Sequence, residues 1–449
     1  MSLQFITGNS GNGKTKYLFN RIVKEAKANP RDNYLVIVPE QFTMQTQRQL
    51  VDLSENKAIM NIDVLSFKRL AYRVFDELGI TNLTVLEETG KNLVLRKLAA
   101  QEADKLGVIG RNLNRIGYIS EVKSLLSELV QYNISPEELG RYIASGRLSD
   151  TLSDKLKDVL VLYEAFEKFM QDKYITAEEI LNVLSNVAEE SAILRNSVIA
   201  FDEFTGFTPI QNQLIKKLFV ISKKIYVTLT IDCREDIFKS RGMQELFDMP
   251  KRTVKSLTEM AAFYGIEVEE PIILDKNYRL AENEELSFME QQLFRKRRCS
   301  VKKAPKHIHI DCLRDPKQEL TKIARRINEL VRNENLRYRD IAIVTGDVNI
   351  YAGYVREIFD KYNIPYFIDA TQEILFHPFI EFIRSIPDIA AQHFSADAVF
   401  RFLRCGFSEL LDSEIDVLEN YVLACGVRGK SAWDKKWVRL PKHKAGYDL

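Results

Sequence analysis

With 449 residues, the chain is too long for one ordinary domain and predicts about two to four of them. Its formal net charge of +1 excludes a general attraction for nucleic acid, so any DNA-binding surface has to be local. The five cysteines lack zinc or disulfide spacing, and we expect neither a membrane span nor a secretory leader, which favours a cytoplasmic protein with reduced thiols.

The first predicted elements are a strand, a glycine-rich loop and a helix. Residues 3–7 form an apolar run, and apolar residues recur at helical spacing from Leu18 to Ala26. The segments "YLVIVP" (34–39) and "DVLSF" (63–67) predict further buried strands, the second leading into an amphipathic helix. Short buried strands that alternate with helices predict a parallel sheet covered on both faces.

A helical block interrupts this pattern. From about residue 87 to 194 only helical periodicity occurs, and strands resume at "SVIAFDEF" (197–204) and "KIYVTLTI" (224–231). The sequence therefore predicts a discontinuous first α/β domain, residues 1–86 plus 195–280, interrupted by an all-helical insertion at 87–194.

A second α/β domain is predicted at residues 281–375. Its expected strands are "HIHIDCL" (307–313), "IAIVTG" (341–346) and "PYFID" (365–369), separated by two helical patterns. Residues 376–449 become helical again, and we expect them to be a truncated helical insertion.

The loop after the first strand fits the phosphate-binding pattern GxxxxGK[ST]. Glycines are needed there because backbone amides must converge on phosphate oxygens at a helix N-terminus. Lys14 is expected to reach the β- and γ-phosphates, and Thr15 to hold magnesium. The residues predicted to surround the phosphates are Gly8, Asn9, Ser10, Gly11, Asn12, Gly13, Lys14 and Thr15.

Two carboxylates follow the buried strand in "VIAFDEF". Asp202 is a candidate ligand of magnesium, and Glu203 is a candidate general base that polarises the attacking water. Taken alone, the pair reads better as a strand end that meets solvent. Together with the phosphate loop, the functional interpretation is favoured.

Four segments resemble motifs of superfamily 1 DNA helicases of the UvrD type: "ITGNSGNGKT", "VPEQFT", "VLSFKRLAYRVF" and "FDEFTGFTPIQNQLI". More closely, the whole chain resembles the N-terminal half of the AddB family, the B subunits of AddAB ATP-dependent helicase/deoxyribonucleases. "LDKNYRL" resembles helicase motif IV, which offers Tyr278 for stacking on adenine and Arg279 for a phosphate contact, and reads alternatively as a domain hinge.

The resemblance implies two RecA-like P-loop domains with parallel sheets and all-helical insertions, with ATP and Mg²⁺ as cofactors. It implies a component of a heterodimer that processes double-strand breaks for recombinational repair and recognises the Chi signal. The implied partners are an AddA-like helicase/nuclease subunit and single-stranded and duplex DNA ends, in a cytoplasmic, nucleoid-associated setting. The family's nuclease domain and iron–sulfur cluster are expected only in a C-terminal part outside this chain.

The chain departs from active motors of this type. They carry a glutamine before the loop and a GDxxQ motif after a later strand, whereas here that strand runs into "TIDCREDIF". We therefore expect ATP binding with little or no hydrolysis and a motor-inactive half. The alternatives are an active superfamily 1 helicase, a P-loop metabolite kinase with a small acceptor pocket, and a structural scaffold in which Lys14 is vestigial.

Three loops after strands form the predicted surface for single-stranded DNA, because aromatic rings stack on bases and polar or basic groups contact phosphates. For Phe42 and Phe67, burial in the core is about as probable as stacking. A basic cluster at residues 295–306 reads either as a DNA or partner clamp or as a solvated linker. The predicted DNA contacts are Gln41, Phe42, Thr43, Ser66, Phe67, Arg69, Tyr72, Phe207 and Thr208.

Overall fold

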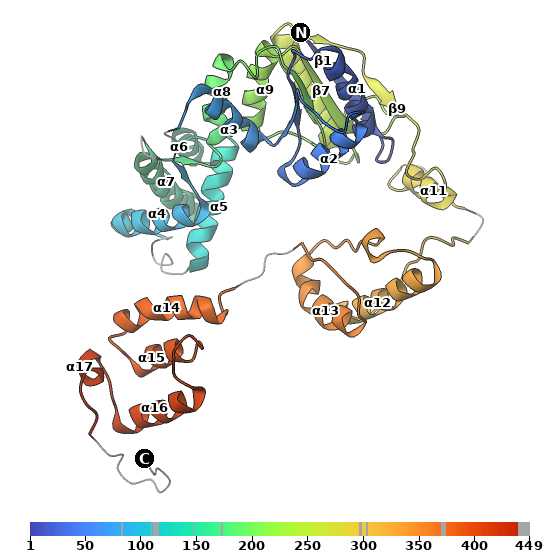
Figure 1. Ribbon diagram of the computed structural model, residues 1–449. Coiled ribbons are helices and arrows are strands. Elements are labelled where there is room, and N and C mark those ends of the chain that lie inside the picture. The colour runs from blue at the N-terminus through green and yellow to red at the C-terminus, as the bar shows by residue number, and fades with distance from the viewer. Residues whose placement is uncertain are drawn as a thin grey trace. The chain divides into compact units, whose positions relative to one another are not determined.

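The structure is a computed structural model that describes residues 1–81, 84–108, 110, 116–146, 148–171, 174–295, 299–301, 304–369 and 374–438 (Figure 1). The chain divides into two compact units, Met1–His309 and Ile310–Leu449. The basic residues 296–298 and 302–303 lie outside the described part of the chain.

A seven-stranded sheet in the order β3-β2-β6-β7-β1-β8, with β9 also paired to β1, is the centre of the first unit. All of its pairings are parallel. Most of its longer strands are buried along nearly their whole length, as expected for strands covered on both faces. The strands are β1 (Ser2–Gly8), β2 (Tyr34–Ile37), β3 (Ile62–Leu65), β6 (Val198–Phe201), β7 (Lys224–Thr230), β8 (Glu267–Val268) and β9 (Ile272–Leu274).

Helices cover both faces of the sheet (Figure 1). Because side chains alternate along a strand, Leu3 and Phe5 of β1 join one core, whereas Ile6 joins the other. The core with Ile6 includes α1 (Lys14–Ala28) and α2 (Thr43–Leu53). The opposite core includes α3 (Phe67–Leu78), α8 (Ile180–Val187), α9 (Pro209–Ile221) and α10 (Asp248–Phe263).

The block between β3 and β6 has a separate core formed mainly by four helices. They are α4 (Glu88–Gln101), α5 (Ile116–Gln131), α6 (Pro136–Ala144) and α7 (Asp150–Met170). The block is not purely helical, because β5 (Ile175–Thr176) pairs with β4 (Val85–Leu86). A pairing of two residues per strand is too short to leave a periodic signal in the sequence. Outside this helical block, the first unit also contains α11 (Glu284–Gln292).

The second unit consists of helices and extended segments. Its helices are α12 (Pro316–Asn333), α13 (Val348–Lys361), α14 (Pro378–Ala391), α15 (Ala396–Leu403), α16 (Asp412–Cys425) and α17 (Lys430–Trp433). No described residue of 307–313, 341–346 or 365–369 belongs to a strand, so the prediction of strands there is wrong. Ile310, Val344 and Phe367 are 93%, 92% and 89% exposed. An apolar pattern gives a segment strand tendency, but a strand forms only against a hydrogen-bonding neighbour.

Candidate nucleotide site and neighbouring groove

The register of the sheet brings several predicted site residues to one edge. Gly8 at the end of β1 pairs with Thr230 of β7, and Ile37 of β2 pairs with both Phe201 of β6 and Leu65 of β3. Because the strands are parallel, the loops that follow them emerge at the same edge, where open α/β sheets bind ligands.

The glycine-rich loop has a shape that only glycine permits at its centre. Gly11 and Gly13 have φ of 89° and 78°, and Gly13 is the residue before the first turn of α1. A Cβ at Gly11 would lie 2.7 Å from Asn277 Oδ1 and 2.8 Å from Arg279 Cβ. The loop therefore packs closely against the segment that follows β9.

Two asparagine side chains fasten this loop to distant segments. Asn12 Nδ2 donates to the Leu274 carbonyl at 2.6 Å. Asn9 Nδ2 donates to Glu290 Oε1 on α11 at 2.7 Å, and Asn9 Oδ1 accepts from the Cys233 amide at 3.2 Å. These two side chains hold the loop in place through contacts within the protein.

Lys14 lies across the loop. Its Nζ donates to the carbonyl oxygens of Gly8 at 3.1 Å and Asn9 at 3.0 Å. Burial lowers the pKa of the Lys14 ammonium below its ordinary value of 10.5, although the carboxylates of Glu203 and Asp202 act in the opposite direction. Among the described residues, the hydrogen-bond partners of this desolvated ammonium are carbonyl oxygens, which leaves it well suited to receive an anion.

Thr15 meets both predicted carboxylates. Its hydroxyl lies 3.3 Å from Asp202 Oδ1 and 3.3 Å from Glu203 Oε1. Asp202 is buried and also accepts a hydrogen bond from the Thr228 hydroxyl of β7. Its other oxygen, Oδ2, is buried and has no hydrogen-bond partner among the described residues. A buried carboxylate oxygen without a partner beside a threonine hydroxyl fits a divalent cation.

These groups line a cavity of about 840 Å³. Tyr278, which is 65% exposed, and Arg279 form part of its wall, and Arg279 Nη1 donates to Ser10 Oγ at 3.3 Å. One face of α2 forms another part of the wall, which the sequence did not reveal because polar residues on an exposed helix face are ordinary. Its residues there include Gln45, Gln49 and Asp52.

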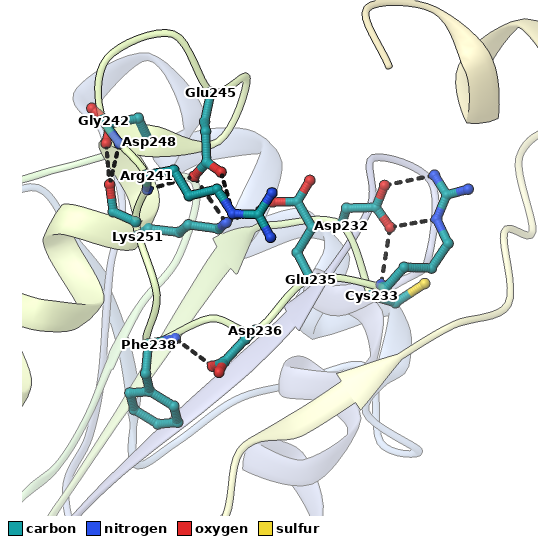
Figure 2. Close-up of polar contacts among 12 residues, drawn as sticks. Asp232, Cys233, Glu235, Asp236, Phe238, Arg241, Gly242, Glu245, Asp248 and Lys251 are labelled. Carbon is teal, nitrogen blue, oxygen red and sulfur yellow. Dashed lines mark hydrogen bonds and ion pairs between the residues drawn. The ribbon is translucent and has the colours of Figure 1, made fainter. Parts of the chain in front are cut away.

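In the segment after β7, residues 231–251, charged side chains form ion pairs with one another (Figure 2). Asp232 accepts from Arg234 Nε at 2.9 Å and from Arg234 Nη2 at 2.6 Å. Lys251 is buried between Glu235 at 2.7 Å and Glu245 at 3.2 Å. No described residue of 231–251 lines the cavity, so this segment contributes to the site only by holding Asn9.

The predicted DNA residues Phe67 and Phe207 belong to one aromatic cluster. Phe67 is 7% exposed, and its ring centroid lies 5.8, 5.6 and 6.3 Å from those of Phe201, Phe204 and Phe207. The structure thus brings the loops after β3 and β6 together. Phe67 is a core residue in this arrangement, so its ring packs against the rings that follow β6.

The other predicted DNA residues are divided between surface and interior. Gln41 is exposed, Phe42 packs partly into the core below α2, and Thr43 is buried with its hydroxyl donating to the Glu40 carbonyl at 2.9 Å. Tyr72 is exposed on α3. The side chains on the surface are the ones available to a ligand.

Two hydroxyl residues among the predicted DNA contacts cap helices. Ser66 Oγ accepts from the Arg69 amide at 3.3 Å, and Thr208 Oγ1 accepts from the Gln211 amide at 3.3 Å. The Arg69 side chain is exposed and makes no hydrogen bond or ion pair with the described residues. Arg69 and its exposed neighbour Lys68 are therefore basic groups of these loops that are available to an anion.

Arg295, the first residue of the basic cluster, is not a free surface charge. Its Nη2 lies 2.7 Å from Asp232 Oδ2, and its guanidinium lies 5.2 Å from the centroid of the Phe247 ring. In the part of the chain that the structure describes, no group of three or more His, Cys, Asp or Glu side chains could hold a metal ion. None of the described helices is both long and apolar enough to span a bilayer.

The pKa of Asp202 gives a stability prediction. Burial raises this pKa above its ordinary value of 3.8, although the hydrogen bonds from Thr228 and Thr15 act to lower it. The folded protein therefore binds this proton more tightly than the unfolded chain, and the free energy of unfolding falls as pH rises from 3.8 through the raised pKa. Without nucleotide or Mg²⁺, we expect Asp202→Asn to have a free energy of unfolding at pH 7 about 0.5–2 kcal/mol higher than that of the wild type. Urea titration measures this difference.

The increase in the free energy of unfolding of Asp202→Asn should become smaller as the pH of the urea titrations falls toward 4. Asp232→Asn is the matched control, because Asp232 is also buried, but the hydrogen bonds from Arg234 outweigh burial and lower its pKa below 3.8. Its charge stabilises the fold above that pH, so Asp232→Asn should be less stable than the wild type at pH 7. Equal effects of the two substitutions would contradict the assignment of Asp202.

A parallel sheet with a glycine-rich loop, a half-buried lysine and two adjoining carboxylates at its carboxyl edge places this chain among the α/β proteins whose candidate ligand site lies at the strand ends. Residues 5–290 match the family model described as "ADDB, N-terminal". The chain belongs to the AddB family.

Its relatives include proteins named as the B subunits of ATP-dependent helicase/deoxyribonucleases. That of Lachnoclostridium phytofermentans is 38% identical over 454 residues, which cover 100% of this chain and 39% of the relative. Those of Clostridium acetobutylicum and Clostridioides difficile are each 34% identical, over 98% and 100% of this chain and 38% and 39% of the relatives. The chain thus spans about two fifths of the length of these relatives.

Proposed function

We propose that the first unit is a RecA-like P-loop lobe that binds ATP with Mg²⁺. In this proposal the loop amides and Lys14 bind the phosphates, Thr15 and Asp202 hold the magnesium, and Tyr278 stacks on the base. The observation that carries the proposal is the buried, unpartnered Oδ2 of Asp202 at the cavity beside Thr15. Calorimetry with Mg²⁺ and a non-hydrolysable ATP analogue tests it, and no measurable heat of binding would contradict it.

We further propose that the chain is the helicase-like part of a protein that acts on DNA ends with an AddA-like partner in recombinational repair. Membership of the AddB family and the names of its relatives support this role. This helicase-like part is motor-inactive in our proposal. Its segment after β7 carries residues that form ion pairs with one another, at the place where active motors carry a sensing glutamine. It binds single-stranded DNA and takes part in reading the Chi signal.

A hydrolytic function is the second candidate, since Glu203 lines the same cavity as Lys14 and Thr15. In that case Glu203 accepts a proton from water at the cavity. Phosphate release by the chain with ATP, Mg²⁺ and single-stranded DNA separates the two candidates. Turnover that disappears in Glu203→Gln would favour the hydrolytic one.

Arg69 provides the test of the DNA surface. We expect Arg69→Ala to weaken binding of a fluorescent oligothymidylate by about fivefold, on the order of 1 kcal/mol, because one charged phosphate contact is lost. The slope of log affinity against log salt should become shallower by about 0.7. Fluorescence anisotropy at several salt concentrations measures both quantities.

Arg195→Ala is the matched control for Arg69→Ala. Arg195 is also exposed, but it precedes β6 and so lies at the opposite edge of the sheet from the predicted loops. This variant should leave both the affinity and the salt slope unchanged. Equal losses in the two variants would indicate a general charge effect and would remove the support for a DNA contact at Arg69.

A further inference from the structure

A second cavity lies beside the nucleotide cavity. Its volume is about 320 Å³, and it lies where the loops after β2, β3 and β6 meet. Of the described residues, Phe204 alone lines both this cavity and the one of about 840 Å³. The other residues around the smaller cavity include Pro39, Glu40, Ser66, Phe67 and Lys68.

The ring of Phe204 is part of the wall of this groove. Its centroid lies 5.6 Å from that of Phe67, 6.2 Å from that of Phe201 and 5.2 Å from that of Phe207. These rings come from the start of α3, the end of β6 and the loop before α9. A displacement of Phe204 therefore changes the packing of the loops after β3 and β6, because close-packed rings move together.

The backbone next to Phe204 is strained. Glu203 has φ of 64°, a left-handed conformation that is unfavourable for a residue with a Cβ. Its carboxylate is held 3.3 Å from the Thr15 hydroxyl, the same hydroxyl that meets Asp202 in the proposed magnesium site. Occupation of that site changes the contacts of Thr15 and so removes part of what keeps Glu203 strained.

We infer that Phe204 is a positioning residue that couples occupancy of the nucleotide cavity to the affinity of the neighbouring groove for single-stranded DNA. The inference rests on the proposed function. Glu203 is the hinge: relaxation of its backbone turns Phe204 against the aromatic cluster. The coupling acts in both directions, because a nucleotide that alters DNA affinity is itself bound with an affinity that DNA alters by the same factor.

The experiment is a thermodynamic cycle on the 449-residue chain. Anisotropy of a fluorescent oligothymidylate of about 16 nucleotides is measured with and without Mg²⁺ and a non-hydrolysable ATP analogue. For the wild type we expect the analogue to change the oligonucleotide Kd by about fivefold or more. For Phe204→Leu we expect that factor to fall to within about twofold of unity when the analogue is present at a concentration that saturates the variant.

Phe201→Leu is the control for loosening of the aromatic cluster. Phe201 contacts the same rings but lines neither cavity, so this variant should melt at a lower temperature and keep the wild-type coupling. Equal coupling in wild type and Phe204→Leu, or loss of coupling in Phe201→Leu as well, overturns the role of Phe204. A wild-type chain that binds no analogue or no oligonucleotide overturns the proposed function itself.

Discussion

Lys14→Ala should weaken binding of Mg²⁺ and a non-hydrolysable ATP analogue by about 100-fold, or roughly 3 kcal/mol, in a calorimetric titration. The large effect follows from the position of the ammonium. Lys14 is held by the carbonyl oxygens of Gly8 and Asn9 at 3.1 and 3.0 Å, in a half-buried position near the carboxylates of Asp202 and Glu203. No other described lysine contacts the loop in this way.

Lys24→Ala is the control for Lys14→Ala, because Lys24 is exposed on the same helix but lies outside the cavity. It carries the same charge, so a change in overall electrostatics would appear in both variants. We expect wild-type affinity for Lys24→Ala. If Lys14→Ala bound the analogue as tightly as the wild type, the glycine-rich loop would be a scaffold and the proposed nucleotide site would be wrong.

Gly8→Ala should lower the free energy of unfolding by about 2–3 kcal/mol. A Cβ at Gly8 would lie 2.6 Å from the Leu274 carbonyl of β9, and backbone cannot move aside as the end of a side chain can. The pairing of β1 with β9 would have to open, and the segment that carries Tyr278 would shift with it. Urea unfolding measures the loss, and the affinity for the nucleotide analogue should fall in the same variant.

Gly117→Ala provides the comparison. Gly117 lies in α5, and among the described residues no atom outside its chain neighbours and the backbone of its own helix lies within 4 Å of the position that its Cβ would take. Alanine is favoured over glycine within a helix by about 0.8–1.0 kcal/mol, so this variant should be slightly more stable than the wild type. The same chemical change thus has opposite signs at the two positions. A loss at Gly8 no larger than about 0.5 kcal/mol would refute the steric argument.

The longer strands of the first unit could be predicted from the sequence because each is an uninterrupted apolar run. The predicted runs at 34–39, 197–204 and 224–231 contain β2, β6 and β7. β8 and β9 were missed, since strands of two or three residues have no periodicity. The apolar runs at 307–313, 341–346 and 365–369 form no strand in the described residues. A strand depends on a partner, and local sequence does not contain the partner.

In the candidate site, too, the residues that follow a local sequence pattern could be predicted, whereas their partners far along the chain could not. Lys14 and Asp202 could be proposed because each follows a strand pattern, and parallel strands bring such ends to one edge. The partners that fix the loop could not be proposed. Asn9 binds Glu290 and Asn12 binds Leu274, 281 and 262 residues further along the chain. The burial of Phe67 was likewise undecided, because it depends on rings from a different loop.

The register of β1 has a consequence for biosynthesis. Ser2 pairs with Lys224 and Gly8 with Thr230, so a ribosome must add more than 200 residues before this strand meets its partner. At about 5–20 residues per second, the wait is roughly 10–40 s. During that time a nascent segment rich in apolar residues has open hydrogen-bonding edges on both sides, which invites pairing with other chains. The first strand therefore remains open to such pairing until the last strands of its own sheet have been made.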